Sequence, residues 1–175
     1  MRFYEELVVD IPDYPKPGVV FKDLTPLFAD GRAFAAVVDD LAEHFADRGI
    51  TKVVGAEARG FIVGAAVARS LGAGFVPARK PGKLPRDVMA QSYALEYGTD
   101  SLEMHADALT PADEVLVVDD LMATGGTTAA MARLVQATGA QITGFGFVVE
   151  LAFLNPRAVL APVTDAEVFS LMKIE

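Results

Sequence analysis

Two adjacent aspartates, Asp119 and Asp120, stand between an apolar run and a loop of small and hydroxyl-bearing residues. The run at residues 115–118 is typical of a strand that is buried on both faces of a parallel sheet. Residues 129–137, beyond the loop, have a helix-forming composition. Loop N–H groups and a helix N-terminus attract an anion, while carboxylates accept hydrogen bonds from sugar hydroxyls or lie near a metal ion. The stretch therefore predicts a site for a phosphorylated sugar. The loop residues in question are Ala123, Thr124, Gly125, Gly126 and Thr127.

The same stretch excludes two other phosphate-binding motifs. No Lys-Ser or Lys-Thr pair follows the glycines, as it would in a nucleotide P-loop, and no G-x-G-x-x-G follows the strand, as it would in a dinucleotide site. An ordinary strand–turn–helix connection, whose glycines only shape the turn, is the simpler alternative. An ordinary connection does not need an apolar run, an acidic pair, Ala-Thr-Gly-Gly-Thr and a helix in this order. The joint pattern therefore favours the phosphate site.

A second candidate is a basic cluster in an otherwise acidic chain. It consists of Arg79, Lys80, Lys83 and Arg86. Such a cluster is by default a solvated loop, and a site for a small, highly charged anion is the sharper interpretation. The formal net charge of −9 argues against nucleic acid as the main partner.

Length and composition place the chain among ordinary globular domains. Its 175 residues are enough for one domain with a sizeable core, and 52% of them are hydrophobic. The chain has no cysteine, which excludes disulfides, thiolate metal sites and cysteine nucleophiles and suits a reducing cytoplasm. The longest wholly apolar run, at residues 61–68, is too short to span a bilayer, and no signal peptide is recognisable. We therefore expect a cytoplasmic protein with no membrane partner.

Strands that alternate with helices are expected to position these clusters. Residues 1–30, broken by several prolines, predict an irregular hood. Helical spacing of apolar residues predicts a helix at 32–47, and short apolar runs predict strands. The alternation implies an α/β fold, a doubly wound and mostly parallel sheet flanked by helices. The further elements are expected at residues 52–56, 61–71, 74–78 (a sheet edge, because of Pro77), 142–149 and 169–172.

The insertion at residues 79–105 differs in texture from the core. Alternating residues at 93–98 and 101–105 predict the two arms of a hairpin, and a long insertion between core strands is often a mobile lid. Ligands of doubly wound sheets bind beyond the carboxyl ends of the strands. We therefore expect the loops at residues 57–60, 79–83 and 119–128 to meet there.

Four further blocks, at residues 13–23, 57–61, 79–85 and 95–98, occur in order with the central motif. Together they resemble the adenine phosphoribosyltransferase family, among the type I phosphoribosyltransferases, over almost the whole chain. The resemblance implies one phosphoribosyltransferase domain over residues 1–175. It also implies a purine-salvage reaction in which adenine and phosphoribosyl pyrophosphate (PRPP) give AMP and pyrophosphate. Magnesium is then held mainly by the substrate pyrophosphate, near the acidic pair, with no dedicated protein cage.

The resemblance assigns roles to individual residues. Residues 123–127 hold the 5′-phosphate, and Asp119 and Asp120 hold the ribose hydroxyls. The pyrophosphate is held by Glu57, Ala58, Arg59, Arg79, Lys80 and Lys83. The base pocket consists of Val20, Phe21, Lys22 and Leu151, with Phe21 stacking on the purine. Family members commonly carry arginine at the position of Lys22, so a backbone contact is kept here and a guanidinium-specific one is lost.

Further expectations concern the lid, the backbone and the assembly. Glu96 and Tyr97 are implied as catalytic residues, Glu96 by managing purine protonation, and the alternatives are a solvated loop residue and a packing residue. The Glu57–Ala58 bond is expected to be cis, as in related pyrophosphate loops. A homodimer is expected, with the Arg59 and Arg79 loops near its interface.

Two other functions remain as alternatives. One is a phosphoribosyltransferase for another purine, such as xanthine or guanine, whose 6-oxo group would need recognition. The other is a PRPP-sensing regulator that kept the fold and lost the chemistry. A regulator would need a nucleic-acid-binding module and a basic face, which this sequence does not supply. His44 and His105 have no paired metal-ligand spacing and are assigned to no site.

Overall fold

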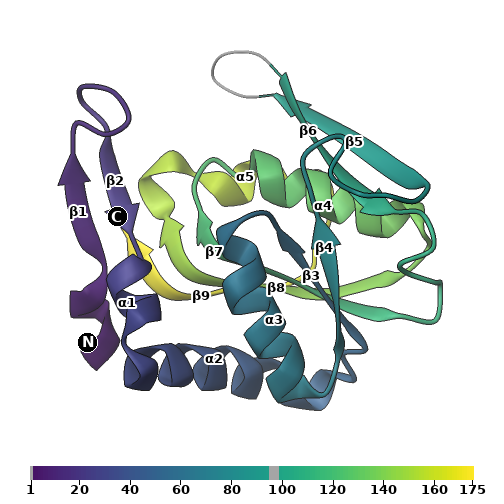
Figure 1. Ribbon diagram of the computed structural model, residues 1–175, viewed down its shortest axis with the longest axis horizontal. Coiled ribbons are helices and arrows are strands. Elements are labelled where there is room, and N and C mark those ends of the chain that lie inside the picture. Colours follow the sequence, from purple (N-terminus) through teal and green to yellow (C-terminus); the bar gives the residue numbers. More distant parts are fainter. Residues whose placement is uncertain (1, 95–98) are drawn as a thin grey trace.

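A computed structural model describes residues 2–94 and 99–175 of the chain. Its centre is a five-stranded sheet with the order β4-β3-β7-β8-β9, and every pairing in it is parallel (Figure 1). Pro77 lies on the edge strand β4, as predicted, because an edge needs one hydrogen-bonding side only. The strands are β3 (Lys52–Ala56), β4 (Gly74–Ala78), β7 (Glu114–Met122), β8 (Gln141–Leu151) and β9 (Val168–Ile174).

Helices cover both faces of this sheet (Figure 1). On one face lie α2 (Gly31–Phe45), which continues as η2 (Ala46–Arg48), and α3 (Arg59–Leu71). On the other lie α4 (Gly126–Ala137) and the short α5 (Pro156–Leu160), which follows η3 (Ala152–Leu154). Each face buries its own apolar cluster, and the residues at the centre of β7 contribute to both. The doubly wound α/β fold predicted from the sequence is confirmed.

Local chemistry explains where the helices lie. The Asp30 carboxylate accepts a hydrogen bond from the Ala33 N–H at 2.8 Å and caps α2. Phe45, at the end of this helix, is fully buried. A Cβ atom at Gly144 would lie 2.6 Å from the Phe45 ring, so this glycine of β8 allows the close packing of α2 on the sheet.

Two ribbons lie outside the central sheet (Figure 1). The hood ribbon is the antiparallel pair β1 (Val9–Pro12) and β2 (Val20–Asp23), flanked by η1 (Phe3–Leu7) and α1 (Thr25–Ala29). The lid ribbon is the antiparallel pair β5 (Val88–Ala94) and β6 (Thr99–His105). A short extended segment was expected at residues 19–23, and β2 confirms it. The prediction of an irregular hood was wrong for β1, η1 and α1, since regular elements form despite the prolines.

Two boundaries also differ from prediction. The aspartates do not end β7, which runs through them to Met122 because β8 continues to pair with it at Leu121 and Met122. The antiparallel pairing of the predicted hairpin is confirmed, but its first arm begins at Val88, and the predicted positions 95–98 lie outside the described residues. The acidic pair is therefore held within a sheet strand, which fixes its backbone more firmly than a loop would.

Candidate active site

The three loops expected to meet at the carboxyl ends of the strands do so through direct contacts. Arg59 Nε lies 2.9 Å from Asp120 Oδ2, which joins the start of α3 to β7. A Cβ atom at Gly60 would lie 2.6 Å from Asp119 Oδ1, so only glycine allows this close approach. Arg79 Nε donates to Glu57 Oε2 at 2.8 Å, which joins the ends of β3 and β4. Side chains at the carboxyl ends of three neighbouring strands thus form one polar cluster.

The loop after β7 presents unpaired backbone donors. Gly125 is the N-cap of α4 with φ +86°, a conformation that favours glycine. The N–H groups of Gly126, Thr127 and Thr128 form the first helical turn, where no intrahelical acceptor exists. Thr128 is buried, whereas Thr124 is exposed and can turn its hydroxyl toward a ligand. The loop therefore presents N–H groups and hydroxyls to an anion at a helix N-terminus.

The two aspartates differ in their surroundings. Burial, reinforced by the neighbouring Asp120 charge, raises the pKa of the Asp119 carboxyl well above its usual range. Burial also raises the pKa of Asp120, and the Arg59 guanidinium opposes that shift. Asp120 Oδ2 has Arg59 at ion-pair distance but no hydrogen bond of good geometry. Asp120 Oδ2 is therefore an acceptor without a hydrogen-bond donor, which suits a hydroxyl group of a ligand.

The residues expected to hold pyrophosphate fall into two groups. The Glu57–Ala58 peptide bond is cis, as predicted, and it adjoins Arg59. Burial would raise the pKa of Glu57, but the hydrogen bond from Arg79 and one from the Lys80 backbone outweigh it and lower that pKa. Lys80 forms an ion pair with Asp100 of the lid, and the Lys83 carbonyl accepts a hydrogen bond from Arg79 at 3.2 Å. These cations are held in place by acidic residues and by the lid ribbon.

The lid ribbon is tied to this basic loop by its backbone. The N–H and C=O groups of Arg79 and Glu103 form a reciprocal pair at 2.8 and 2.7 Å. The Gly82 N–H donates to the Glu103 carboxylate at 3.0 Å. The position of β6 and that of the basic loop are therefore coupled. Glu96 and Tyr97, the proposed catalytic residues of the lid, lie outside the described residues.

The residues expected to bind a base lie on both faces of β2. Val20, Lys22 and Leu151 line a pocket of about 500 Å³ between the hood and the end of β8. Phe21 points to the opposite face, because successive side chains of a strand alternate. There the Arg59 guanidinium lies over its ring at 5.2 Å, and the ring of Tyr14 meets it edge-on.

Sequence reasoning did not assign five residues that line this pocket, namely Asp10, Gly18, Val19, Phe153 and Leu154. Asp10 lies beside Lys22 and accepts a hydrogen bond from its Nζ at 2.6 Å, while Phe153 and Leu154 line the far wall. The signal for the last two was an apolar pair that follows a strand immediately before Asn155. Phe153 is 59% exposed, which is unusual for phenylalanine and consistent with the rim of a ligand pocket.

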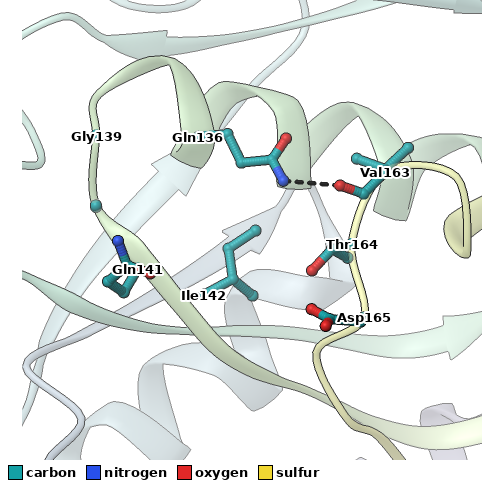
Figure 2. A pocket seen from close by; sticks show the side chains of 8 residues that line it. Gln136, Gly139, Gln141, Ile142, Val163, Thr164 and Asp165 are labelled. Carbon is teal, nitrogen blue, oxygen red and sulfur yellow. Dashed lines mark hydrogen bonds between the residues drawn. The ribbon is translucent and has the colours of Figure 1, made fainter.

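Another cavity lies at the amino end of β8 (Figure 2). The candidate active site lies at the opposite, carboxyl ends of the strands. Gln136 of α4 donates to the Val163 carbonyl at 2.8 Å across its rim. Its polar residues lie mostly on the surface, and no charged group in it is buried. It has no contact with the three loops described above.

Comparison with known proteins decides the family. Residues 27–174 match the family model of the phosphoribosyl transferase domain. Adenine phosphoribosyltransferase of Aeromonas salmonicida is 52% identical over 174 residues, which are 99% of this chain and 96% of that protein. The chain belongs to the adenine phosphoribosyltransferase family. It is therefore a transferase of the glycosyltransferase class.

Solved structures of the family have the same fold. The crystal structure of adenine phosphoribosyltransferase from Thermoanaerobacter pseudethanolicus is similar with a TM-score of 0.93 and 44% identity, covering 98% of each chain. The enzyme from Giardia lamblia, solved in complex with 9-deazaadenine, has a TM-score of 0.92 and 38% identity, with 98% of this chain and 96% of that chain covered. The type I phosphoribosyltransferase fold predicted from the sequence is thus confirmed.

Proposed function

We propose that this chain transfers the 5-phosphoribosyl group of PRPP to adenine, giving AMP and pyrophosphate, a reaction of purine salvage. Family membership supports the reaction. The observation that carries the assignment of residues is the position of Arg59. Its guanidinium lies over Phe21, the proposed base-stacking ring, and beside Asp120, a proposed ribose ligand. One side chain thus joins the base side of the site to the sugar side.

The phosphoribosyl group occupies the end of β7 in this proposal. The 5′-phosphate accepts hydrogen bonds from the loop N–H groups and hydroxyls of residues 123–127 at the N-terminus of α4. The ribose hydroxyls donate to the carboxylates of Asp119 and Asp120, and Asp120 Oδ2 has no hydrogen-bond donor within the protein. This division places a negative group at the helix and neutral donors at the acidic pair.

The leaving pyrophosphate lies between the Glu57–Arg59 loop and the basic loop. Breaking its bond to ribose C1 builds positive charge on the sugar and negative charge on the pyrophosphate. Arg59 and Arg79 bind phosphate oxygens through their forks of donors, whereas Lys80 and Lys83 act as point charges. Arg59 leaves the Phe21 ring as it takes up this role, which frees that ring to stack on adenine.

Adenine lies at the edge of β2, with Phe21 on one face of that strand and the pocket lined by Val20, Lys22 and Leu151 on the other. The base attacks through N9, which must lose its proton during or after the transfer. We assign management of this proton to Glu96, with Tyr97 beside it, because a lid carboxylate can reach the purine once the lid closes. Closure of the lid also excludes water, which would otherwise compete for the sugar cation.

Magnesium fits this set of donors as a substrate-borne ion. The described residues contain no cluster of three metal-ligating side chains. Mg²⁺ typically keeps several waters and takes one or two carboxylates together with phosphate oxygens, which Asp119 and Asp120 can supply beside the pyrophosphate. When bound, the ion neutralises charge on the leaving group, while the arginines orient it.

We further propose a homodimer in the cytoplasm. Ile62, three positions after Arg59 on α3, is 45% exposed, which supports an interface close to the Arg59 loop. Light scattering at assay concentration is expected to give twice the chain mass, and a monomer that is fully active would contradict the proposal. In the part of the chain that the structure describes, no helix has the length and hydropathy needed to cross a membrane.

The decisive experiment is AMP formation from adenine and PRPP with Mg²⁺, compared with hypoxanthine, guanine and xanthine. We expect rapid product with adenine and at least about 100-fold lower kcat/KM with each oxo-purine, since a buried site built for one hydrogen-bonding edge rejects another. Turnover with an oxo-purine alone would contradict the base assignment. Binding of PRPP without turnover of any base would favour a regulator.

A further inference from the structure

A buried carboxylate outside the proposed reaction holds together the segment that connects the base pocket to the phosphate loop. Glu150, at the end of β8, is 2% exposed. It accepts hydrogen bonds from Arg157 Nε at 2.7 Å and from Arg157 Nη2 at 2.8 Å. The Ser170 hydroxyl of β9 donates to the same carboxylate at 2.7 Å. We call these three side chains the Glu150 clamp.

The electrostatics of the clamp favour its charged form. The two hydrogen bonds from Arg157 are the main cause that lowers the pKa of Glu150, against the effect of burial. The same contact raises the pKa of Arg157. A fork of two parallel N–H···O bonds fixes orientation as well as distance. The clamp therefore orients a partly exposed guanidinium on a buried carboxylate.

The clamp joins the two ends of a short segment, residues 150–157. This segment contributes to the base pocket and also contacts the phosphate loop. Leu151, Phe153 and Leu154, which follow Glu150 directly, line the proposed base pocket. Pro156, which precedes Arg157, meets the phosphate loop: a Cβ atom at Gly125 would lie 2.5 Å from the Pro156 carbonyl oxygen. The residues that line the base pocket (the base wall, residues 151–154) and Pro156, which contacts the phosphate loop, thus lie between Glu150 and Arg157 in the chain.

We propose that Glu150, acting through Arg157, is a positioning residue that sets the base wall and the phosphate loop at a fixed distance from each other. Neither residue touches the reacting atoms. The clamp determines the spacing of the two substrate-binding surfaces, which must match the span from base to 5′-phosphate. This inference rests on the proposed function, because only that function requires both surfaces at once.

Kinetic constants distinguish a positioning role of the clamp from a role in stability alone. Arg157→Met removes the fork and keeps much of the side-chain bulk. We expect KM for adenine to rise about 10-fold and KM for PRPP to rise severalfold, with kcat within about threefold of wild type, since alignment is lost before the chemical step. A role in stability alone lowers the melting temperature or the active fraction and leaves both KM values unchanged.

Further variants keep the inference falsifiable if Arg157→Met folds poorly. Arg157→Lys keeps the charge but loses the fork, and Ser170→Ala removes one hydrogen bond, so both should shift the two KM values in the same direction and less far. Arg133→Met, on the exposed side of α4, is the matched control and should change neither constant. Unchanged KM values in the two milder variants, or a fall in kcat alone, would overturn the proposal.

The failure of the proposed function has a different signature. If the wild-type chain makes no AMP from adenine, the function is refuted independently of the clamp. The affinity for PRPP, measured by calorimetry without a base, then still decides whether Arg157 positions the Gly125 loop. A severalfold weaker affinity in Arg157→Met would support that half of the proposal, and an unchanged affinity would overturn it.

Discussion

The acidic pair with its phosphate loop and the two ribbons differ in how firmly the rest of the fold holds them. The acidic pair lies on β7, which is paired on both sides within the five-stranded sheet and buried on both faces. The hood ribbon and the lid ribbon are each two-stranded and lie beside that sheet. A two-stranded ribbon is marginally stable by itself, and the lid ribbon is supported by Tyr93, Leu102 and Met104, which are buried in one of the core clusters. A central strand is among the last elements to open.

The proposed function assigns binding of the charged substrate groups to β7 and the loop after it, and recognition of the base to the ribbons. Groups that bind a highly charged ligand benefit from a backbone that does not move, because preorganised donors require no reorganisation during reaction. Recognition of the base and its proton is assigned to the ribbons, which must open to admit a substrate and then close over it. The comparison therefore predicts that substitutions in the ribbons change kcat or the adenine KM, and that substitutions on β7 change kcat/KM for PRPP.

The largest effect is expected from Glu96→Gln on the lid. If Glu96 manages the purine proton, kcat should fall by about 100-fold or more, while the KM values change little, because general acid–base groups act in the transition state. Steady-state rates of AMP formation measure this. Asp87→Asn, at an exposed position directly before β5, is the control for a charge lost elsewhere near the ribbon. An unchanged kcat in Glu96→Gln would remove the role proposed for this residue.

The next effect concerns the sugar ligands on β7. Asp120→Asn keeps the shape of the side chain but loses a charged acceptor, so kcat/KM for PRPP should fall by about 30- to 100-fold, as for loss of one hydrogen bond to a charged group. Saturation with adenine isolates this constant. A fall confined to the adenine KM would break the proposed division between β7 and the ribbons.

The same division explains what the sequence predicted well. Residues 115–118 predicted a buried strand, which is confirmed, because an apolar run acts through its near neighbours. The anion site in the loop after them stays a prediction. The ends of β7 and of the lid strand were predicted less well. Pairing of Leu121 and Met122 with β8 extends β7 through the aspartates, and such pairing depends on residues far along the chain.

Contacts between side chains were the part that the sequence could not supply. The role predicted for Arg59 as a phosphate ligand did not reveal its position over Phe21, because that position depends on the packing of α3 against the hood. The pairing of Asp10 with Lys22 follows from the register of β1 with β2, and β1 itself was not predicted. Glu150 also gave no local signal, since its three donors come from α5 and β9.

A smaller effect is expected at the base of the hood. Lys22→Met breaks the contact with Asp10, so β2 is held less firmly, and KM for adenine should rise about 3- to 10-fold with KM for PRPP unchanged. Lys22→Arg keeps a cation opposite Asp10 and should restore most of the affinity. Initial rates at varied adenine concentration measure both variants. A parallel rise in KM for PRPP would show that the hood and the phosphate loop are not independent.

The smallest effect is expected on stability, at Asp119. There, a substitution that stabilises the ligand-free chain should weaken the binding of PRPP. Asp119 has a raised pKa in the folded chain, so the folded state binds its proton more readily than the unfolded state does. Stability therefore falls as pH rises from about 4, the unfolded value, through the raised folded pKa, and the full cost is present above it. Asp119→Asn removes this cost in the ligand-free chain.

We accordingly expect Asp119→Asn to raise the melting temperature at pH 7 by about 3 °C, as for a gain of about 1 kcal/mol in a domain of this size, while it weakens PRPP binding. The gain should shrink as the pH is lowered toward about 4, because the wild-type carboxyl is then protonated. Asp39→Asn, at an exposed position of α2, is the matched control for removal of one charge. Scanning calorimetry at several pH values measures the difference. A lower melting temperature at pH 7 would mean that the Asp119 carboxylate is stabilised by its neighbours, and that the acidic pair is part of the framework of β7 instead of a cost carried for the sugar.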